Sequence, residues 1–329
     1  MIRLYIQNEN GIERTADIEN LSCRPEDIFW VDLLTPDAAE LQFAEQLCKI
    51  EMPTQDEMRE IEATSRLYTE DGARFMTTTV LSRVETEEPI LSEMTFILKS
   101  ERIVTIRHTD SYSFRVFSHQ LLRQRQISRD QVFVGLLETI VDRQADVLER
   151  FGTDLDALSK RVFSHRHTTK GRKKEPVTQE MRVVLEDLGS IGDLITRQRD
   201  CLVNLLRLLS YASNAETSDP SQPNLYVTLR PISRDVNSLS EYASFLSSKI
   251  NFMLDAVLGL INIEQNEIVK IFTVASVIFM PATLIASIYG MNFENMPELR
   301  SEYGYGSVLV AMAVSIILPL LFFRMKRFI

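Results

Sequence analysis

Cysteine is scarce in this chain, and the three cysteines that it has lie far apart. Cys23, Cys48 and Cys201 form no C-x-x-C pair and no closely spaced framework, so the sequence argues against a disulfide-stabilised fold. We expect reduced thiols in a cytosolic region. The N-terminus also lacks the basic start, apolar centre and small-residue cleavage site of a signal peptide, so we expect this region not to be exported.

Basic residues are also fewer than acidic residues. The chain has 36 Lys and Arg residues against 46 Asp and Glu residues, and the net charge of −10 argues against a nucleic-acid partner, because phosphates need a basic face. Metal-ligand spacings, nucleophile elbows and phosphate-binding loops are absent as well. We therefore predict that the protein is not an enzyme and has no organic cofactor.

Charged residues are missing altogether from two apolar runs near the C-terminal end, residues 271–289 and 307–323. Each run is near the roughly 17–25 residues that a transmembrane helix needs. Pro281 and Pro319 interrupt them, which membrane helices tolerate when neighbours satisfy the freed carbonyl groups. A buried core helix is the alternative for one such run, but two runs in tandem favour an integral membrane protein.

The charges that flank the two runs predict their orientation. Lys270 precedes the first run, and the second is followed by Arg324, Lys326 and Arg327, whereas the segment between the runs is mostly acidic. Because positive charge prefers the cytoplasmic side, both termini should be cytoplasmic, in a plasma (inner) membrane. The segment between the runs should then face the outside.

Small and polar residues recur at seven-residue spacing on one face of the first run. Two spans from one chain cannot enclose an aqueous path, so a pore would need one helix from each of several copies. The two adjacent rows are Asp255, Asn262, Val269, Ser276, Thr283 and Gly290, and Gly259, Asn266, Thr273, Met280 and Ser287. Because the rows begin well before the apolar run, we predict a single helix from about residue 230 to 289. Tight helix packing without water is the alternative.

The region before residue 230 combines strand and helix patterns. Apolar runs bounded by turn residues predict strands at 28–34, 73–84, 93–100 and 102–108. Helical patterns begin at Asp37 and cover 129–161 and 178–212. The overall prediction is an α+β fold with these parts: an α/β domain (1–125), a long helical hairpin (126–228), a stalk helix continuing into the first transmembrane helix (229–289), a loop (290–306), a second transmembrane helix (307–323) and a basic tail (324–329).

The segment between the two apolar runs carries a recognisable signature. Gly290, Met291 and Asn292 form a Gly-Met-Asn triplet, and residues 296–299 read Met-Pro-Glu-Leu. With its flanks, from residue 266 onward, this segment resembles the CorA family of magnesium and cobalt transporters. The resemblance implies a funnel-shaped homopentamer with a cytoplasmic α/β domain and a central pore lined by the first transmembrane helix.

The resemblance also implies a selectivity filter in this segment, formed by Gly290, Met291 and Asn292, with Asn292 facing the metal. Mg²⁺ gives up its waters reluctantly, so a filter should recognise the hydrated ion. Amide and carbonyl oxygens suit that task, whereas carboxylates in direct contact would hold the ion too tightly. Glu294 and Glu298 would concentrate cations at the entrance.

Further residues along the first transmembrane helix would line the path or its gate. They are Asn266, Phe272, Thr273, Met280, Thr283, Ser287 and Asp255. A ring of Met280 side chains could close the path by dewetting. Asp255 would form an acidic, metal-facing ring lower in the stalk, while Phe272 lies slightly off the polar face.

Closure at high cytosolic Mg²⁺ is another implication of the resemblance, which would make Mg²⁺ a regulator as well as the substrate. At the position that aligns with a regulatory acid of the family, this chain has Pro231. Asp235 is the nearest substitute, and Glu241 is a weaker one. A solvated helix face is the alternative for both carboxylates.

A basic segment separates the two long helical patterns and contains His165 and His167. In the family the corresponding tip is often acidic. We interpret the segment as an exposed tip that contacts anionic lipid headgroups, with a metal site as the alternative.

Together these features predict a divalent-cation channel that mediates influx of Mg²⁺, with Co²⁺ or Ni²⁺ as further candidate cargoes. A membrane potential of about 100 mV, negative inside, supplies about 4.6 kcal/mol per divalent ion, so no nucleotide is needed. A zinc transporter of the related ZntB type is the nearest alternative. A membrane-anchored oligomeric sensor or scaffold is the alternative from another class. The expected partners are divalent cations, the bilayer and further copies of the chain.

Overall fold

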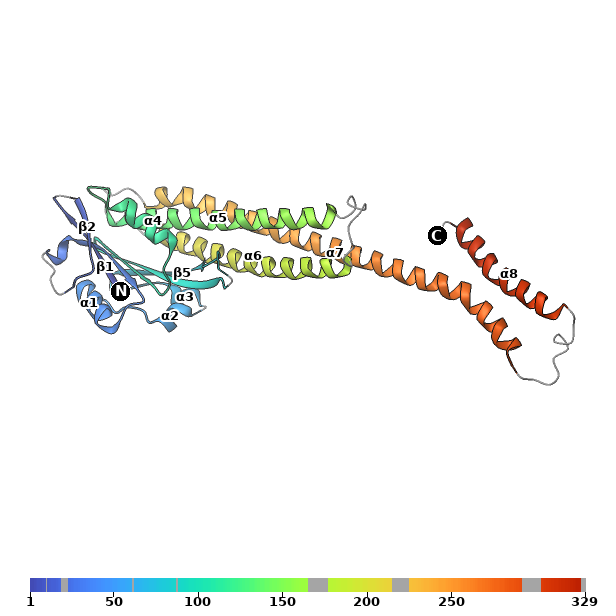
Figure 1. The fold of residues 1–329 in the computed structure, drawn as a ribbon. Coiled ribbons are helices and arrows are strands. Elements are labelled where there is room, and N and C mark those ends of the chain that lie inside the picture. The colour runs from blue at the N-terminus through green and yellow to red at the C-terminus, as the bar shows by residue number, and fades with distance from the viewer. Residues whose placement is uncertain are drawn as a thin grey trace. The chain divides into compact units, whose positions relative to one another are not determined.

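Two compact units make up this chain in a computed structural model, residues 1–169 with 184–253 and residues 170–183 with 254–329. Figure 1 shows the order of their helices and strands. The structure describes these residues: 1–9, 11–18, 23–60, 62–86, 88–164, 177–214, 225–291 and 303–326.

A seven-stranded sheet forms the centre of the first unit, in the order β2-β1-β3-β7-β6-β5-β4. Its strands are β1 (Ile2–Asn8), β2 (Gly11–Thr15), β3 (Ile28–Leu34), β4 (Leu67–Glu70), β5 (Ala73–Ser82), β6 (Ile90–Lys99) and β7 (Arg102–Arg107). The central pair, β3 and β7, is parallel, whereas the other neighbours are antiparallel. The four predicted strands are confirmed as β3, β5, β6 and β7, and β1, β2 and β4 were not predicted.

Helices cover both faces of this sheet, as Figure 1 shows. One face packs an aliphatic cluster that includes Leu4, Val31 and Ile106 against α1 (Ala38–Cys48) and α2 (Gln55–Arg59). Helix α1 begins with a capping box, in which Asp37 accepts from the Glu40 backbone N–H and Glu40 accepts from that of Asp37. The short helices η1 (Pro25–Asp27) and α3 (Ala63–Arg66) complete the connections.

The opposite face packs aromatic side chains against α4 (Tyr112–Leu121) and the long helix α5 (Arg129–Ser164). The Trp30 ring lies 5.8 Å from the Phe117 ring, and the Phe96 ring lies 5.5 Å from that of Phe133. Tyr5 stacks on Trp30 at 4.1 Å. These contacts fix both helices to the sheet, since aromatic side chains bury large apolar areas.

A buried ion pair lies under α4. Arg107 donates from Nη2 and Nε to the two carboxylate oxygens of Asp32, at 2.7 and 3.0 Å, and both side chains are only 1% exposed. Thr105 donates to the same carboxylate at 2.9 Å and accepts from the Trp30 indole at 3.0 Å. The Arg107 guanidinium also lies 4.5 Å from the centre of the Phe114 ring. The sheet and α4 are therefore joined by a polar network in which both charges are paired.

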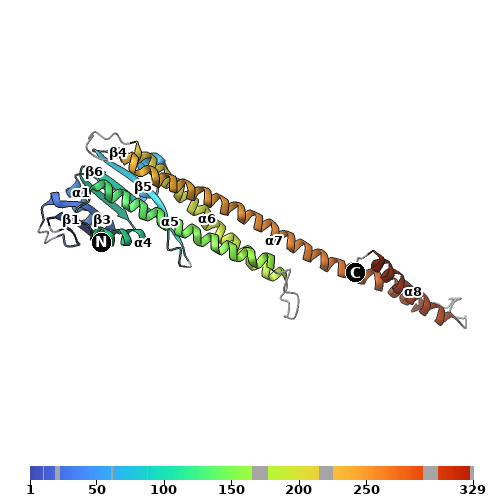
Figure 2. The ribbon, with the colours of Figure 1, turned by 90° about the horizontal axis from the view of Figure 1, so that it is seen from above.

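Three long helices continue the first unit beyond the sheet: α5, α6 (Val177–Ser213) and the first part of α7 (Leu225–Tyr289). Figures 1 and 2 both show them side by side. Gly152 on α5 permits a close approach, because an added Cβ would lie 2.4 Å from the Tyr242 hydroxyl on α7. Lys249 on α7 forms an ion pair with Asp156 on α5. The predicted long helices at 129–161 and 178–212 are confirmed.

Helix α7 is uninterrupted to Tyr289, which confirms the single helix predicted from about residue 230. Pro231 and Pro281 both lie inside it. Helix α8 (Gly304–Met325) contains the second apolar run and Pro319. The predicted basic segment with His165 and His167 lies outside the described residues, so its interpretation stays a prediction.

Burial makes Cys201 chemically inert. The thiol is 3% exposed, and burial raises its pKa to about 12. Because the thiolate is the reactive form, we expect Cys201 in the native protein to resist a maleimide at about pH 8 and to react fully after denaturation. Mass spectrometry of a Cys23→Ser variant would measure this, since Cys48 is buried as well. Rapid labelling of native Cys201 would show that α6 opens locally.

Candidate functional site

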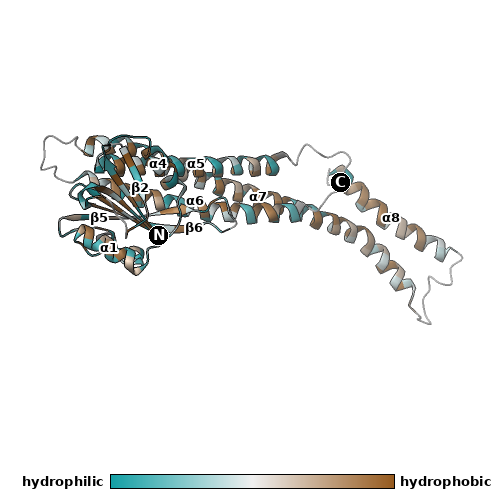
Figure 3. Ribbon diagram, turned by 60° about the vertical axis from the view of Figure 1, so that its left-hand side comes forward, coloured by the Kyte–Doolittle hydropathy of each residue, from teal (hydrophilic) through white to brown (hydrophobic). Residues whose placement is uncertain are grey.

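Helix α8 and helix α7, whose later part lies in the second unit, are long and apolar enough to cross a membrane. The most apolar window of α7 has a mean hydropathy of 2.1, and that of α8 has 2.5. Figure 3 shows hydrophobic residues along α8 and the later part of α7. Large side chains such as Phe272 and Leu318 are 69% and 64% exposed. Burying such surface is worth about 25 cal/mol per Å², so lipid or other protein must cover these helices.

The polar rows of α7 lie on its exposed side. All eleven of their members, from Asp255 to Gly290, are exposed. The less exposed positions between residues 271 and 290 recur at three- and four-residue spacing and are Val274, Ala275, Ile278, Pro281, Ala282, Ile285 and Tyr289. Such spacing is that of one helix face. One apolar face of the helix is therefore partly covered within its own unit, and the rows are exposed, as are the bulky side chains of Phe279 and Leu284.

Two row hydroxyls form hydrogen bonds to the carbonyls four residues earlier. Thr273 Oγ1 donates to the Val269 carbonyl at 2.8 Å, and Thr283 Oγ1 donates to the Phe279 carbonyl at 2.9 Å. Each hydroxyl proton is thus held by the helix, while the oxygen keeps lone pairs that can accept. This orientation suits contact with the water of a hydrated cation, because such water donates its hydrogens.

The apolar helix ends at the predicted filter. The Gly290 N–H donates to the Ala286 carbonyl at 2.9 Å, and the Met291 N–H donates to that of Ile288 at 3.3 Å. A Cβ at Gly290 would lie 3.0 Å from the Ala286 carbonyl oxygen, a tight contact that glycine avoids. Asn292, Glu294 and Glu298 lie outside the described residues, so the rest of the filter and the acidic entrance stay predictions.

The structure does not test the role of the remaining predicted site residues. Asn266, Met280, Ser287 and Asp255 are exposed members of the rows, and Phe272 stands beside them. Asp235 is exposed on α7, twenty residues before Asp255, so one helix cannot bring these two carboxylates to one ion. Among the residues that the structure describes, no group of three or more His, Cys, Asp or Glu side chains is placed to hold a metal ion.

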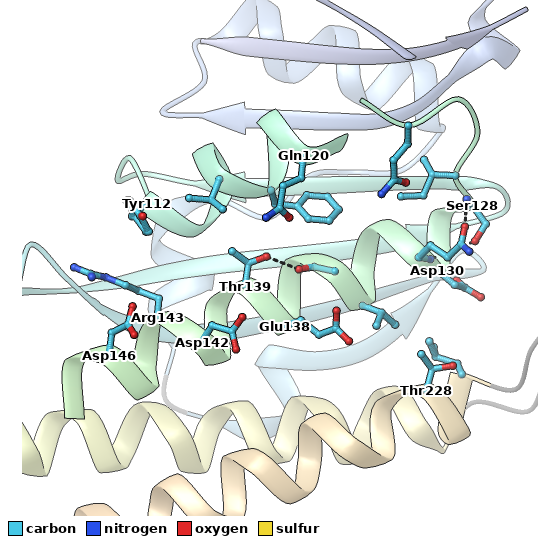
Figure 4. A pocket seen from close by; sticks show the side chains of 18 residues that line it. Tyr112, Gln120, Ser128, Asp130, Glu138, Thr139, Asp142, Arg143, Asp146 and Thr228 are labelled. Atoms are coloured by element: carbon cyan, nitrogen blue, oxygen red, sulfur yellow. Dashed lines mark hydrogen bonds between the residues drawn. The ribbon is translucent and has the colours of Figure 1, made fainter. Parts of the chain in front are cut away.

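A separate cavity of about 510 Å³ lies in the first unit between α4, α5 and the start of α7. Figure 4 shows Glu138, Asp142 and Asp146 along α5 at this cavity. Burial and the nearby Asp142 charge raise the pKa of Glu138. Arg143 pairs with Glu85 at 2.8 Å. The sequence analysis did not predict this cavity. The signal available in the sequence was the four-residue spacing of these acidic residues, which indicates an acidic face on α5.

Comparison with known proteins gives consistent results for sequence and fold. The sequence model of a family described as CorA-like Mg²⁺ transporter protein matches residues 25–327. The chain is similar to the magnesium transport protein CorA of Haemophilus ducreyi, with 31% identity over 94% of each chain. Its fold resembles the complete CorA magnesium transporter structure from Methanocaldococcus jannaschii, with a TM-score of 0.77, 17% identity and 98% of each chain covered. The ZntB cytoplasmic domain from Vibrio parahaemolyticus is less similar, with a TM-score of 0.54 and 12% identity over 79% of this chain and 97% of that one.

Proposed function

The chain belongs to the CorA family of Mg²⁺ transporters, and on this basis we propose that it mediates influx of hydrated Mg²⁺ through a pore. The observation that carries the proposal is the pair of exposed polar rows on α7, in a helix otherwise apolar enough to span a membrane. Co²⁺ and Ni²⁺ are the further cations to test, because an amide filter selects weakly among hydrated divalent ions.

The pore is formed by several copies, in a homopentamer. A single α7 helix cannot surround water, and every row member is exposed in one chain and so available to other copies. The membrane is the inner membrane, with both termini cytoplasmic. The flanking charges support this orientation, with Lys270 before the apolar run and Arg324 and Lys326 at the end of α8.

Recognition takes place at the outer end of α7. Gly290, Met291 and Asn292 form the filter, in which an amide ring and backbone carbonyls accept hydrogen bonds from the waters around the ion. Glu294 and Glu298 raise the local cation concentration without direct coordination. Thr283 and Ser287 provide the next oxygen atoms along the rows. The driving force is about 4.6 kcal/mol per ion at 100 mV, which makes coupling to a nucleotide unnecessary.

Uptake into liposomes tests this function and its alternatives. Purified protein is reconstituted with an interior-negative potential, and influx of Mg²⁺, Co²⁺, Ni²⁺ and Zn²⁺ is followed with internal indicators. We expect potential-driven Mg²⁺ influx without a proton gradient. Zn²⁺ influx that needs a proton gradient would instead favour a zinc transporter. Tight oligomers that move no divalent cation would favour a sensor or scaffold and contradict the proposal.

Met280 is proposed to be a hydrophobic gate. Its side chain is 68% exposed on the row, and a ring of thioether side chains would exclude water from a narrow path. We expect Met280→Gln to raise Mg²⁺ influx severalfold under conditions that close the wild-type protein, because an amide of similar size lets the constriction fill with water. Met312→Gln on α8 is the matched control. Equal influx in both variants would exclude a gate at Met280.

Cytosolic Mg²⁺ is proposed to close the pore through carboxylates on α7. Asp235 and Asp255 are both exposed, while the nearby position 231 holds a proline without metal-binding capacity. We expect Mg²⁺ on the cytoplasmic face to reduce influx, and Asp235→Asn to raise the concentration needed for half-inhibition. Glu241→Asn, on the same helix, is the comparison. Identical inhibition of the wild-type protein, Asp235→Asn and Glu241→Asn would mean that neither carboxylate takes part in the regulation.

A further inference from the structure

A smaller cavity of about 340 Å³ lies in the first unit, between the end of β5, the beginning of α4 and the first half of α5. Its volume is within the range of sites that hold small ligands. All the residues that line it belong to the first unit, whereas α8 and the apolar part of α7 belong to the second. No lining residue takes part in the proposed pore or its regulation, so this cavity is independent of the proposed function.

Helix α4 begins at this cavity with its first turn uncapped. Ser111 is at the N-cap position, but its side chain accepts no hydrogen bond from the helix. The backbone N–H groups of Tyr112, Ser113 and Phe114 form no hydrogen bond to any residue that the structure describes. Free N–H groups at a helix N-terminus carry partial positive charge and point out of the helix, which is the arrangement that binds anions.

Two buried side chains place further donors at the cavity. Ser113 is 3% exposed and lines the cavity, and its hydroxyl has no hydrogen-bond partner among the described residues. Gln144 is also 3% exposed and lines the cavity. Its carbonyl oxygen accepts from Gln198 Nε2 at 2.6 Å, which leaves its amide N–H groups without a partner in the described part of the chain. Because unpaired buried donors are costly, both side chains indicate a ligand with acceptor oxygens.

Arginine side chains give the cavity a surplus of positive charge. Three arginines and two carboxylates line it. Arg115 pairs with Asp110, and Arg143 pairs with Glu85 at 2.8 Å. Arg83 also lines the cavity and has no ion-pair partner within the described ranges. A local surplus of positive charge in a chain with a net charge of −10 favours an anion at this place.

We infer that this cavity binds the phosphoryl group of a small soluble compound. A phosphoryl group carries a charge of about −1.5 to −2 and three acceptor oxygens. The donors at the cavity are three backbone N–H groups, a hydroxyl, an amide and the Arg83 guanidinium, and they outnumber the two oxygens of a carboxylate. Arg143 can add a bidentate contact by leaving Glu85, whose side chain is 68% exposed and therefore remains solvated.

Hydrogen exchange of the full chain in detergent micelles locates the ligand. Exchange is followed by mass spectrometry with inorganic phosphate, and sodium chloride at the same ionic strength is the control for screening. We expect phosphate, but not chloride, to slow exchange severalfold in the peptide that covers the beginning of α4, because the free N–H groups gain a partner. Peptides of α6 should exchange equally in both salts. Equal exchange of the α4 peptide in both salts would overturn the inference.

Calorimetric titration with inorganic phosphate tests the individual residues. Arg83→Gln breaks no ion pair with a described residue, and Ser113→Ala removes a single hydroxyl, so neither change should disturb the fold. We expect each variant to raise the Kd for phosphate severalfold. Arg197→Gln on α6 is the matched control, because it removes an arginine that is 43% exposed and distant in sequence from the cavity residues. Wild-type affinity in both Arg83→Gln and Ser113→Ala would overturn the assignment.

Nanodiscs separate a soluble phosphoryl compound from a lipid headgroup, which offers the same chemistry. Exchange of the α4 peptide is compared in discs of phosphatidylcholine and in discs that also contain phosphatidylglycerol, both without free phosphate. We expect equal exchange in the two kinds of disc and protection only when inorganic phosphate is added. Protection by phosphatidylglycerol alone would assign the cavity to a lipid and overturn the soluble ligand.

Discussion

Replacing Asn292 with alanine is expected to reduce Mg²⁺ influx at least about tenfold, because each copy loses an amide contact to the hydrated ion and one hydrogen bond of about 1.4 kcal/mol corresponds to a factor of ten. The measurement is initial influx into liposomes at equal protein density and potential. Asn295→Ala is the matched control, since it removes an amide from the same loop outside the Gly-Met-Asn triplet.

The aspartate variant separates the amide's chemistry from its size. Asn292→Asp keeps the shape of the side chain but places a ring of negative charge in the filter. We expect tighter cation binding and slower influx, because direct carboxylate contact holds a divalent ion against release. Influx through Asn292→Ala at the wild-type rate would contradict the filter assignment. A loss of influx that is equal in Asn292→Ala and Asn295→Ala would point to the loop as a whole.

The strands that the sequence predicts are those with long apolar runs. The three central strands of the sheet are β3, β7 and β6, and β5 lies next to β6. Most residues of these four strands are buried. Two of the three missed strands, β2 and β4, are the edges of the sheet, with five and four residues that are mostly not buried, whereas the third, β1, lies inside the sheet and is mostly buried. Such short segments become strands through the partner beside them, which local pattern cannot report.

The polar rows could be predicted because helical periodicity is a local property. Their exposure in a single chain could not, because it depends on which face of α7 the rest of its unit covers. The cavity beside Glu138 likewise depends on how α4 and α5 pack.

The buried pair of Asp32 and Arg107 shows this limit for a single interaction. Asp32 stands inside the apolar run that predicts β3, and a carboxylate there indicates a buried partner. The partner is 75 residues away, on the strand that the sheet topology places beside β3. Local pattern indicates that a cation is needed, while only the parallel pairing of β3 and β7 identifies Arg107.

Asp32→Ala is expected to destabilise the protein by about 3–5 kcal/mol, because it leaves the Arg107 guanidinium charged and 1% exposed, with only the more distant Asp110 carboxylate, at 3.4 Å, to pair with. Arg107→Ala should cost a similar amount for the converse reason. Equilibrium denaturation of the purified protein in detergent measures both. Arg197→Ala is the control, since Arg197 is 43% exposed and pairs with Asp193 at the surface, where an ion pair contributes about 0–1 kcal/mol.

The double variant Asp32→Leu with Arg107→Met tests whether the pair stabilises the fold or only neutralises two buried charges. It removes both charges and keeps apolar volume, so it should be more stable than either single alanine variant, because no charge is left buried alone. Additive losses in the double variant would mean that the network stabilises the fold by its hydrogen bonds to Thr105 and Thr109 rather than by mutual neutralisation. If the double variant is the more stable one, the role of the pair is to position α4 through the Arg107 contact with Phe114. Removing the pair should then lower the hydrogen-exchange protection of α4 more than that of α6.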